Sequence, residues 1–169
     1  MPTIGVSIAV PEPWAAQLQD YRTRLGDATA TLIPTHITLV PPLELAEDAL
    51  AGVEDQLTAA AAAFAPFRVH LRGTATFRPV SPVVFIALAE GISQCEQLAA
   101  RLRTGPLAVD LEHPYHPHVT IAHHLDDAAL DRAFEEQAGF ECAFTCDHFW
   151  LYRHDPDTGW VPTARFELG

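Results

Sequence analysis

The feature that most constrains this chain is a short pattern that occurs twice, at His36-Ile-Thr-Leu39 and at His118-Val-Thr-Ile121. In each copy a histidine is followed two residues later by a threonine, and apolar residues occupy the alternate positions. Side chains at i and i+2 of a β-strand project from the same face. The pattern therefore predicts two strands, each with a His and a Thr on one face and core residues on the other.

The residues around the two copies repeat one order of elements. In the first half, hydrophobic spacing predicts a strand at 4–10, a helix at 13–25, a strand at 32–40, a helix at 44–64 and a strand at 67–77. The second half repeats this order with a strand at 83–88, a helix at 92–102, a strand at 118–122, a helix at 126–137 and a strand at 140–153, and a last strand follows at 160–168. Pro41-Pro42 is interpreted as a turn into a helix, so that both helices that follow a motif begin eight residues after its histidine, at Glu44 and Asp126. We predict one domain, 1–169, made of two α+β lobes (about 1–77 and 78–169) related by a pseudo-twofold axis, with exchange of strands between lobes left open.

Two such strands facing each other across a twofold axis would form one cleft with two imidazoles and two hydroxyls. Imidazole titrates near neutral pH, so one ring can accept a proton while the other donates one. Threonine hydroxyls can donate hydrogen bonds to oxygens on which negative charge develops. The combination suits cleavage of a phosphodiester, and nothing in it is a strong nucleophile or requires a metal. One copy of so short a pattern is weak evidence for a catalytic site, but two copies in matched positions are stronger evidence.

The charge of the chain restricts its partners. It has 10 Arg, no Lys and 22 acidic residues, for a formal charge of −12. Without lysine, Schiff-base chemistry, lysine nucleotidylation and a phosphate-binding P-loop are excluded. An acidic surface does not favour extended nucleic acid, which needs clustered Lys and Arg. A small substrate or the end of an RNA strand fits better, and self-repulsion favours a monomer.

The cysteines and the hydrophobic runs indicate the cellular compartment in which the protein is expected. Three cysteines are scattered over a chain long enough to fold without disulfides, which predicts reduced thiols. The first residues lack a basic leader, and no apolar run approaches the roughly 20 residues of a membrane span. We therefore expect a cytoplasmic protein with no membrane contact.

Two clusters invite a metal-binding interpretation. Five histidines lie within a segment of twelve residues: His113, His116, His118, His123 and His124. If this segment were the site of a metal-dependent hydrolase, the purified protein would contain bound metal. A histidine-triad pattern fails because Thr120 stands where the third alternating His would be, and we interpret most of these residues as loop histidines. Cys142, Cys146 and His148 share strand parity, but the intervening Phe144 favours a core strand with small thiols.

With its flanks, the duplicated pattern resembles the two-histidine (2H) phosphoesterases, which include 2′-5′ RNA ligase-like proteins and 2′,3′-cyclic nucleotide phosphodiesterases. The similar segments are 34–42 (PTHITLVPP) and 115–122 (YHPHVTIA), with looser similarity at Phe77 and in the strand 149–153. The resemblance implies a bilobal α+β fold with antiparallel sheets facing a central cleft and helices outside. It also implies catalysis without metal or cofactor, carried by four residues: His36, Thr38, His118 and Thr120.

The reaction implied by the resemblance is hydrolysis of a 2′,3′-cyclic phosphate on a nucleotide or RNA end, as in RNA processing. Family members often have a basic residue directly after the second motif, where this chain has Ala122-His123. That departure, together with the acidic surface, favours hydrolysis over 2′-5′ ligation of polymers. Arg78 and Tyr115 are candidate substrate-binding residues, by phosphate contact and base stacking, with solvation and packing as their alternatives. A nucleotide- or RNA-end-binding module without catalysis remains the second hypothesis.

Overall fold

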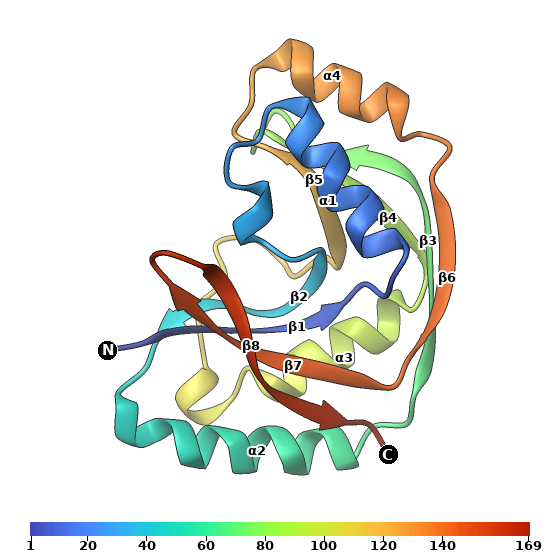
Figure 1. Cartoon of the computed structure of the whole chain (residues 1–169). Helices are drawn as coiled ribbons and strands as arrows, with labels where there is room; N and C mark the ends of the chain where they lie inside the picture. The colour runs from blue at the N-terminus through green and yellow to red at the C-terminus, as the bar shows by residue number, and fades with distance from the viewer.

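The computed structural model describes residues 1–169 and contains eight strands, four α-helices and three short 3-10 helices. The elements, in chain order, are β1 (Thr3–Ala9), α1 (Trp14–Leu25), η1 (Ala30–Leu32), β2 (His36–Glu44), η2 (Glu47–Ala49), α2 (Leu50–Ala62), β3 (Phe67–Thr76), β4 (Val83–Glu90), α3 (Ile92–Leu102), η3 (Gly105–Leu107), β5 (His118–His123), α4 (Asp127–Glu136), β6 (Glu141–Cys146), β7 (His148–Asp155) and β8 (Gly159–Glu167) (Figure 1). No helix is both long and apolar enough to span a bilayer.

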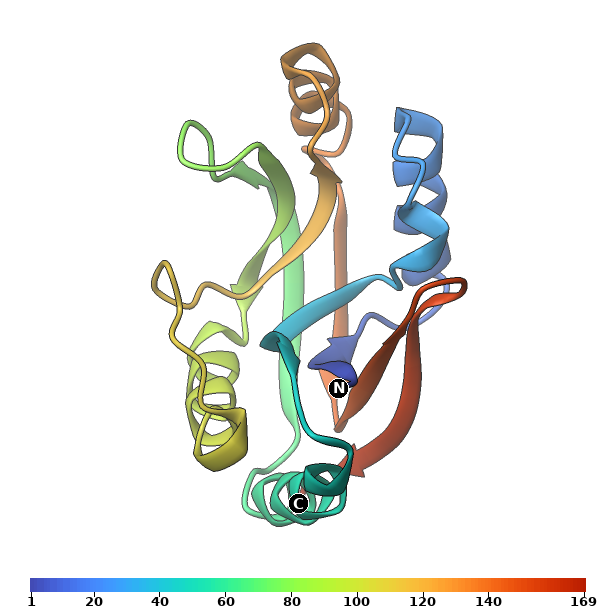
Figure 2. The same ribbon diagram turned by 90° about the vertical axis from the view of Figure 1, so that its left-hand side faces the viewer.

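The strands form two four-stranded sheets, ordered β2-β1-β7-β8 and β5-β4-β3-β6, and every neighbouring pair is antiparallel. The helices lie around the outside of the two sheets (Figure 2). The two motif strands, β2 and β5, occupy equivalent edge positions and contact each other. The predicted α+β fold with two antiparallel sheets and a pseudo-twofold relation is confirmed.

Each sheet takes strands from both halves of the chain. β3 pairs only with β4 and β6, whereas β7 and β8 join the sheet of β1 and β2. The chain changes sheets at Asp147, the single residue between β6 and β7. The prediction of one strand over 140–153 was wrong, because its apolar alternation continues through the residue at which the chain leaves one sheet for the other.

The edge position of β2 explains a second correction. β2 does not begin at Leu32, which lies in η1, and it does not end before Pro41-Pro42 but continues through both prolines to Glu44. Proline cannot donate to a sheet ladder, so it is tolerated at an edge or a bulge. Here the register shifts opposite Gly5, between the pairs Ile4↔Leu43 and Val6↔Val40. The helix expected from Glu44 therefore starts only at Leu50, after η2.

The other helices follow their local signals. α1 ends at Leu25 and is capped by Gly26, which has a φ of 111° and whose N–H donates to the carbonyls of Arg22 and Thr23. α3 spans the predicted residues, and α4 begins after Asp126, whose carboxylate accepts from the Ala129 N–H at 2.8 Å. Helix termini without long-range competition are therefore well predicted.

The alternate residues of both motifs lie in the core, as predicted. Ile37, Leu39, Val119 and Ile121 are fully buried and belong to one cluster of 39 buried apolar residues. Burying each of these side chains contributes about 1.5–3 kcal/mol. This anchorage turns the His and Thr side chains of each strand toward the opposite face.

Candidate active site

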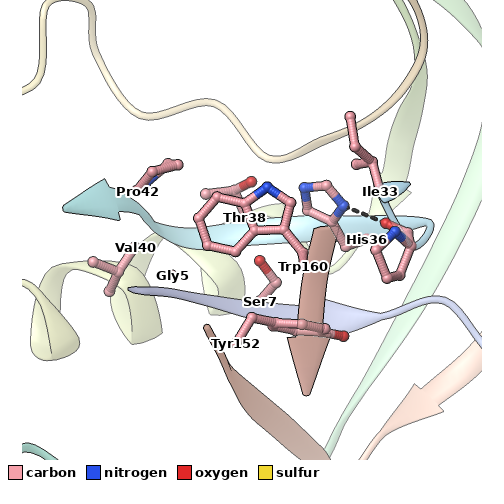
Figure 3. A pocket seen from close by; sticks show the side chains of 10 residues that line it. Gly5, Ser7, Ile33, His36, Thr38, Val40, Pro42, Tyr152 and Trp160 are labelled. Carbon is pink, nitrogen blue, oxygen red and sulfur yellow. Dashed lines mark hydrogen bonds between the residues drawn. The ribbon is translucent and has the colours of Figure 1, made fainter. Parts of the chain in front are cut away.

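His36 and Thr38 open into a pocket over one face of the first sheet (Figure 3). It has about 410 Å³ of empty space, including its open mouth, and ten lining residues: Gly5, Ser7, Ile33, Pro34, His36, Thr38, Val40, Pro42, Tyr152 and Trp160. The segment before His36 is tied to α1, because the Thr35 hydroxyl donates to the Ala15 carbonyl at 2.8 Å and the Gln19 amide donates to the Ile33 carbonyl at 3.3 Å.

The two motif histidines are held in the same way. His36 Nδ1 lies 2.6 Å from the carbonyl oxygen of Pro34, and His118 Nδ1 lies 2.7 Å from that of His116. A carbonyl only accepts, so in both rings Nδ1 carries the hydrogen and Nε2 of the neutral imidazole has a free lone pair. Neither Nε2 atom hydrogen-bonds to another protein group in the structure. The pseudo-twofold relation thus extends to the tautomer of the two rings.

The motif threonines also keep their hydroxyls free. The side chains of Thr38 and Thr120 form no hydrogen bond with the protein, and their main-chain oxygens accept from Tyr115 and Arg22 respectively. No buried side-chain oxygen or nitrogen in the chain lacks a partner, so both hydroxyls reach open space. Two imidazole nitrogens and two hydroxyls are therefore available to a ligand.

Aromatic side chains surround His118. Its ring makes an edge contact with Phe77, at 4.9 Å between centroids, and lies 5.2 Å from the ring of Phe85. Phe77 and Phe85 in turn pack against each other at 4.4 Å. The second motif therefore has aromatic rings beside its histidine, whereas the first opens into a pocket with polar and aromatic walls.

The surroundings lower the pKa of both motif histidines. For His36, burial lowers the pKa, the Pro34 carbonyl opposes this, and the nearby Arg22 charge adds to the lowering. For His118, burial again lowers the pKa, the His116 carbonyl opposes it, and the proximity of His36 lowers it further. Both imidazoles are neutral at neutral pH when the site is empty.

Tyr115 links the two motif strands. Its hydroxyl donates to the Thr38 carbonyl at 2.8 Å, and the Arg103 guanidinium lies 5.6 Å from the centre of its ring. The side chain packs against the core cluster and does not line the pocket. These contacts correspond to the packing alternative, and its role in substrate binding stays a prediction.

A buried ion pair supports the second motif from behind. The Arg22 guanidinium donates to the Asp27 carboxylate at 2.8 Å, and its Nη1 is 3.5 Å from the Thr120 carbonyl. The Asp27 carboxylate also accepts from the N–H and the hydroxyl of Thr29. Although burial opposes it, these hydrogen bonds lower the pKa of Asp27. The pair connects the end of α1 to β5.

Arg78 lies beyond β3 and is engaged by α4. Its guanidinium donates to the Asp131 carboxylate at 2.8 Å and approaches Asp127 at 3.8 Å. Together with Pro79 and Pro82, these three residues line a separate open depression. Contact of Arg78 with a substrate phosphate stays a prediction, and it would require the guanidinium to leave the carboxylates of Asp127 and Asp131.

Neither of the two clusters considered for metals brings three ligand atoms close enough together to share an ion. The histidines of 113–124 divide between the loop before β5, its two ends and the residue after it, and the rings of His123 and His124 contact at 3.6 Å. Cys142 and Cys146 are buried on β6, whereas His148 lies on β7 in the other sheet. The one group of three residues close enough to share an ion is Asp147, His148 and Glu167.

Three residues that were not predicted as site residues also line the His36 pocket: Ser7, Tyr152 and Trp160. Ser7 lies opposite Thr38 on β1. Tyr152 and Trp160 come from β7 and β8, which reach this sheet only through the exchange of strands. A signal existed for Ser7, the one polar residue in the apolar run 4–10. The chain contains no local signal for the other two.

Comparison with known proteins identifies the family of the chain. A family model described as the 2′-5′ RNA ligase superfamily matches residues 10–158. Bcer98_0945 of Bacillus cytotoxicus, a candidate phosphoesterase by its name, is 32% identical over 147 residues, which are 85% of this chain and 84% of that protein. The chain belongs to the 2′-5′ RNA ligase superfamily, and the resemblance predicted from the sequence is confirmed.

Solved structures show the same fold. TT0787 of Thermus thermophilus is 26% identical and aligns with a TM-score of 0.72 over 99% of this chain and 98% of its own. E. coli LigT complexed with 3′-AMP is 20% identical, with a TM-score of 0.62 over 99% of both chains. The fold and the family together identify an enzyme of the phosphoesterase class.

Proposed function

We propose that the protein is a metal-independent phosphoesterase that hydrolyses 2′,3′-cyclic phosphates of nucleotides or RNA ends. The observation that carries this proposal is the matched pair of imidazoles. Each is fixed through Nδ1 with a free Nε2, and each has a free threonine hydroxyl two residues away. The complex of E. coli LigT with 3′-AMP supports it, because a nucleoside 3′-phosphate is one of the two products that opening a 2′,3′-cyclic phosphate can give.

In the proposed reaction, one neutral imidazole accepts a proton from water at Nε2 while the water oxygen forms a bond to phosphorus. The bond from phosphorus to one ribose oxygen breaks, and the second imidazole, protonated at Nε2, gives its proton to that oxygen. Thr38 and Thr120 donate hydrogen bonds to the nonbridging oxygens, where negative charge increases. The product is a nucleoside 2′- or 3′-phosphate, and the two histidines end in exchanged protonation states.

The pKa directions predict when the pair is competent. Catalysis needs one protonated and one neutral ring, a state most populated between the two apparent pKa values of the pair. Because burial lowers the pKa of both His36 and His118 from the ordinary 6.5, kcat/KM should be greatest below pH 6.5. The phosphodiester anion stabilises the imidazolium, so binding should take up a proton and the optimum of kcat should lie at higher pH.

The test is hydrolysis of the four 2′,3′-cyclic nucleotides in EDTA. The proteins are the wild type, His36→Ala, His118→Ala and, as a control, His113→Ala in an exposed loop. Removing a general acid or base typically costs about 10²–10⁴-fold. We expect a loss in that range for each motif variant and none for the control, with a bell-shaped pH profile. Activity that requires added metal, or that survives either motif variant, would refute the mechanism.

Two other outcomes identify the alternatives. Binding of a cyclic nucleotide in the His36 pocket without turnover would indicate a binding module. Joining of RNA ends through a 2′-5′ linkage would indicate a ligase. The formal charge of −12 and the absence of a basic residue at Ala122-His123 favour neither a long RNA partner nor ligation of polymers.

A further inference from the structure

The pseudo-twofold relation between the two motifs is broken beside the histidines. On β1, Ser7 is the cross-strand partner of Thr38, and at the equivalent place on β4, Phe85 is the partner of Thr120. One half of the site therefore has a hydroxyl where the other has a phenyl ring. A ligand bound across both motifs meets two different environments.

Ser7 has no structural use for its hydroxyl. The residue is only 7% exposed, and its Oγ forms no hydrogen bond with the protein. Because no fully buried side-chain oxygen lacks a partner, the small exposed part of Ser7 includes Oγ, which opens into the pocket. The other buried polar residues, Arg22, Asp27 and Thr35, all have protein partners. A buried hydroxyl kept open in this way suits a hydrogen bond to a ligand.

The wall around Ser7 is flat and apolar. The indole of Trp160 and the ring of Tyr152 lie over β1 beside His36 (Figure 3). Gly5 lies directly against the indole, because a Cβ at this position would be in van der Waals contact with Trp160 Cζ3, at 3.6 Å. The turn before Trp160 is held close to η1, since a Cβ at Gly159 would lie 2.2 Å from the Leu32 carbonyl oxygen. The main chain that carries Trp160 is thus packed against η1, and its indole forms part of the pocket wall.

The lack of charged residues in this pocket favours a nucleobase over a second phosphate group as its occupant. None of its ten lining residues is Lys, Arg, Asp or Glu, and His36 is the only titratable group besides Tyr152. A second phosphate of an RNA chain would need a cation here, because phosphate sites in proteins are built with Arg, Lys or several main-chain N–H groups. A neutral, flat, heteroaromatic group needs only a π-face and a hydrogen-bonding edge, and both are present.

We propose that this pocket binds the nucleobase of the substrate, with Trp160 as its stacking surface and Ser7 as the hydrogen-bonding partner of its polar edge. The proposal rests on the proposed function, because it assumes a substrate whose cyclic phosphate lies between the two motifs. Ser7 and Trp160 are then specificity-determining residues. They bind the part of the substrate that does not react, and they act on one side of the pseudo-twofold axis only.

The experiment compares two substrates that share the reacting group. One is a nucleoside 2′,3′-cyclic phosphate, and the other is methyl riboside 2′,3′-cyclic phosphate, which lacks the base. Stacking on one aromatic side chain corresponds to about 10- to 100-fold in affinity. Wild type should therefore prefer the nucleoside substrate by at least tenfold in kcat/KM. Trp160→Ala should remove most of this preference.

Ser7→Ala gives the sharper result. It should lower kcat/KM about fivefold for the nucleoside substrate, mainly through KM, which is the effect of one lost hydrogen bond. It should change the base-free substrate less than twofold. Ser93→Ala, an exposed serine on α3, is the matched control and should change neither. An equal loss on both substrates, or no loss on either, would overturn the proposal.

A binding assay separates the failure of this inference from failure of the proposed function. If wild type hydrolyses neither substrate, the proposed function fails, and calorimetry with a nucleoside 3′-phosphate and with inorganic phosphate still tests the pocket. Tighter binding of the nucleotide, reduced by Ser7→Ala but not by Ser93→Ala, would support the base site. Equal affinity for the two ligands would overturn it.

Discussion

Replacing the Asp27 carboxylate by an amide should reveal how strongly the buried ion pair holds the second motif strand. Asp27→Asn keeps the shape of the side chain but leaves the Arg22 guanidinium, which is 4% exposed, without its counter-charge. Removing one partner of a buried pair typically costs about 3–5 kcal/mol. The entropy of unfolding is about 2.1 cal/mol/K per residue. For the 169 residues of this chain, the melting temperature should therefore fall by about 8–14 °C.

Scanning calorimetry of five proteins checks this value: the wild type, Asp27→Asn, Arg22→Met, the double variant and a control. The control is Asp20→Asn, an exposed aspartate on α1, for which no more than a small shift is expected. In the double variant Arg22→Met/Asp27→Asn, no uncompensated charge remains, so it should be more stable than Asp27→Asn alone. A fall of less than 3 °C in Asp27→Asn, or a double variant that shows the sum of the two single losses, would refute the reasoning.

The same pair has a pH signature. The folded pKa of Asp27 lies below its ordinary 3.8, so its stabilising contribution is complete above the unfolded pKa. It is lost as the pH falls through the folded pKa. Asp27→Asn should lack this part of the acid sensitivity, and the stability difference between wild type and variant should shrink at pH values below 3.8. A constant difference down to the lowest pH would contradict the assignment.

Three further outcomes are expected. Gly159→Ala should lower the Tm and alter tryptophan fluorescence, because a methyl group would collide with η1 at a φ of 81°, whereas Gly52→Ala, in open space on α2, should stabilise by about 0.5–1 kcal/mol. Tyr115→Phe removes the donor to the Thr38 carbonyl and should cost about 1 kcal/mol in urea denaturation, so an unchanged midpoint would deny that bond a role. Burial raises the pKa of Cys95 to about 12, so iodoacetamide should modify this thiol only after unfolding, and rapid labelling of the native protein would contradict its burial.

Local periodicity was sufficient to predict which residues of the two motifs face the core. The alternation in His36-Ile-Thr-Leu39 and His118-Val-Thr-Ile121 depends on neighbours in the sequence alone, and the structure buries the four apolar residues as predicted. The helices with clear caps, such as the one after Asp126, follow for the same reason. The matched Nδ1 bonds of the histidines are equally local, since each acceptor lies two residues before its ring.

The rest of the site depends on contacts that no local pattern contains. Pro41-Pro42 looks like a helix entrance until an edge strand and a bulge opposite Gly5 accommodate it. Residues 140–153 look like one strand because alternation does not show to which sheet a strand belongs. Trp160 reaches His36 only because β7 and β8 pair with β1, a choice made by long-range packing.

The exchange of strands between halves also determines how this chain can be divided. A fragment that ends at Phe77 would contain β3 without either of its pairing partners, and it would expose the edge of β1 that β7 covers. The complementary fragment would carry β7 and β8 as a hairpin without a sheet. Open edges of this kind recruit other strands. The two fragments are therefore expected to aggregate when they are separate and to assemble into the native fold when they are mixed, as two parts of a single cooperative unit.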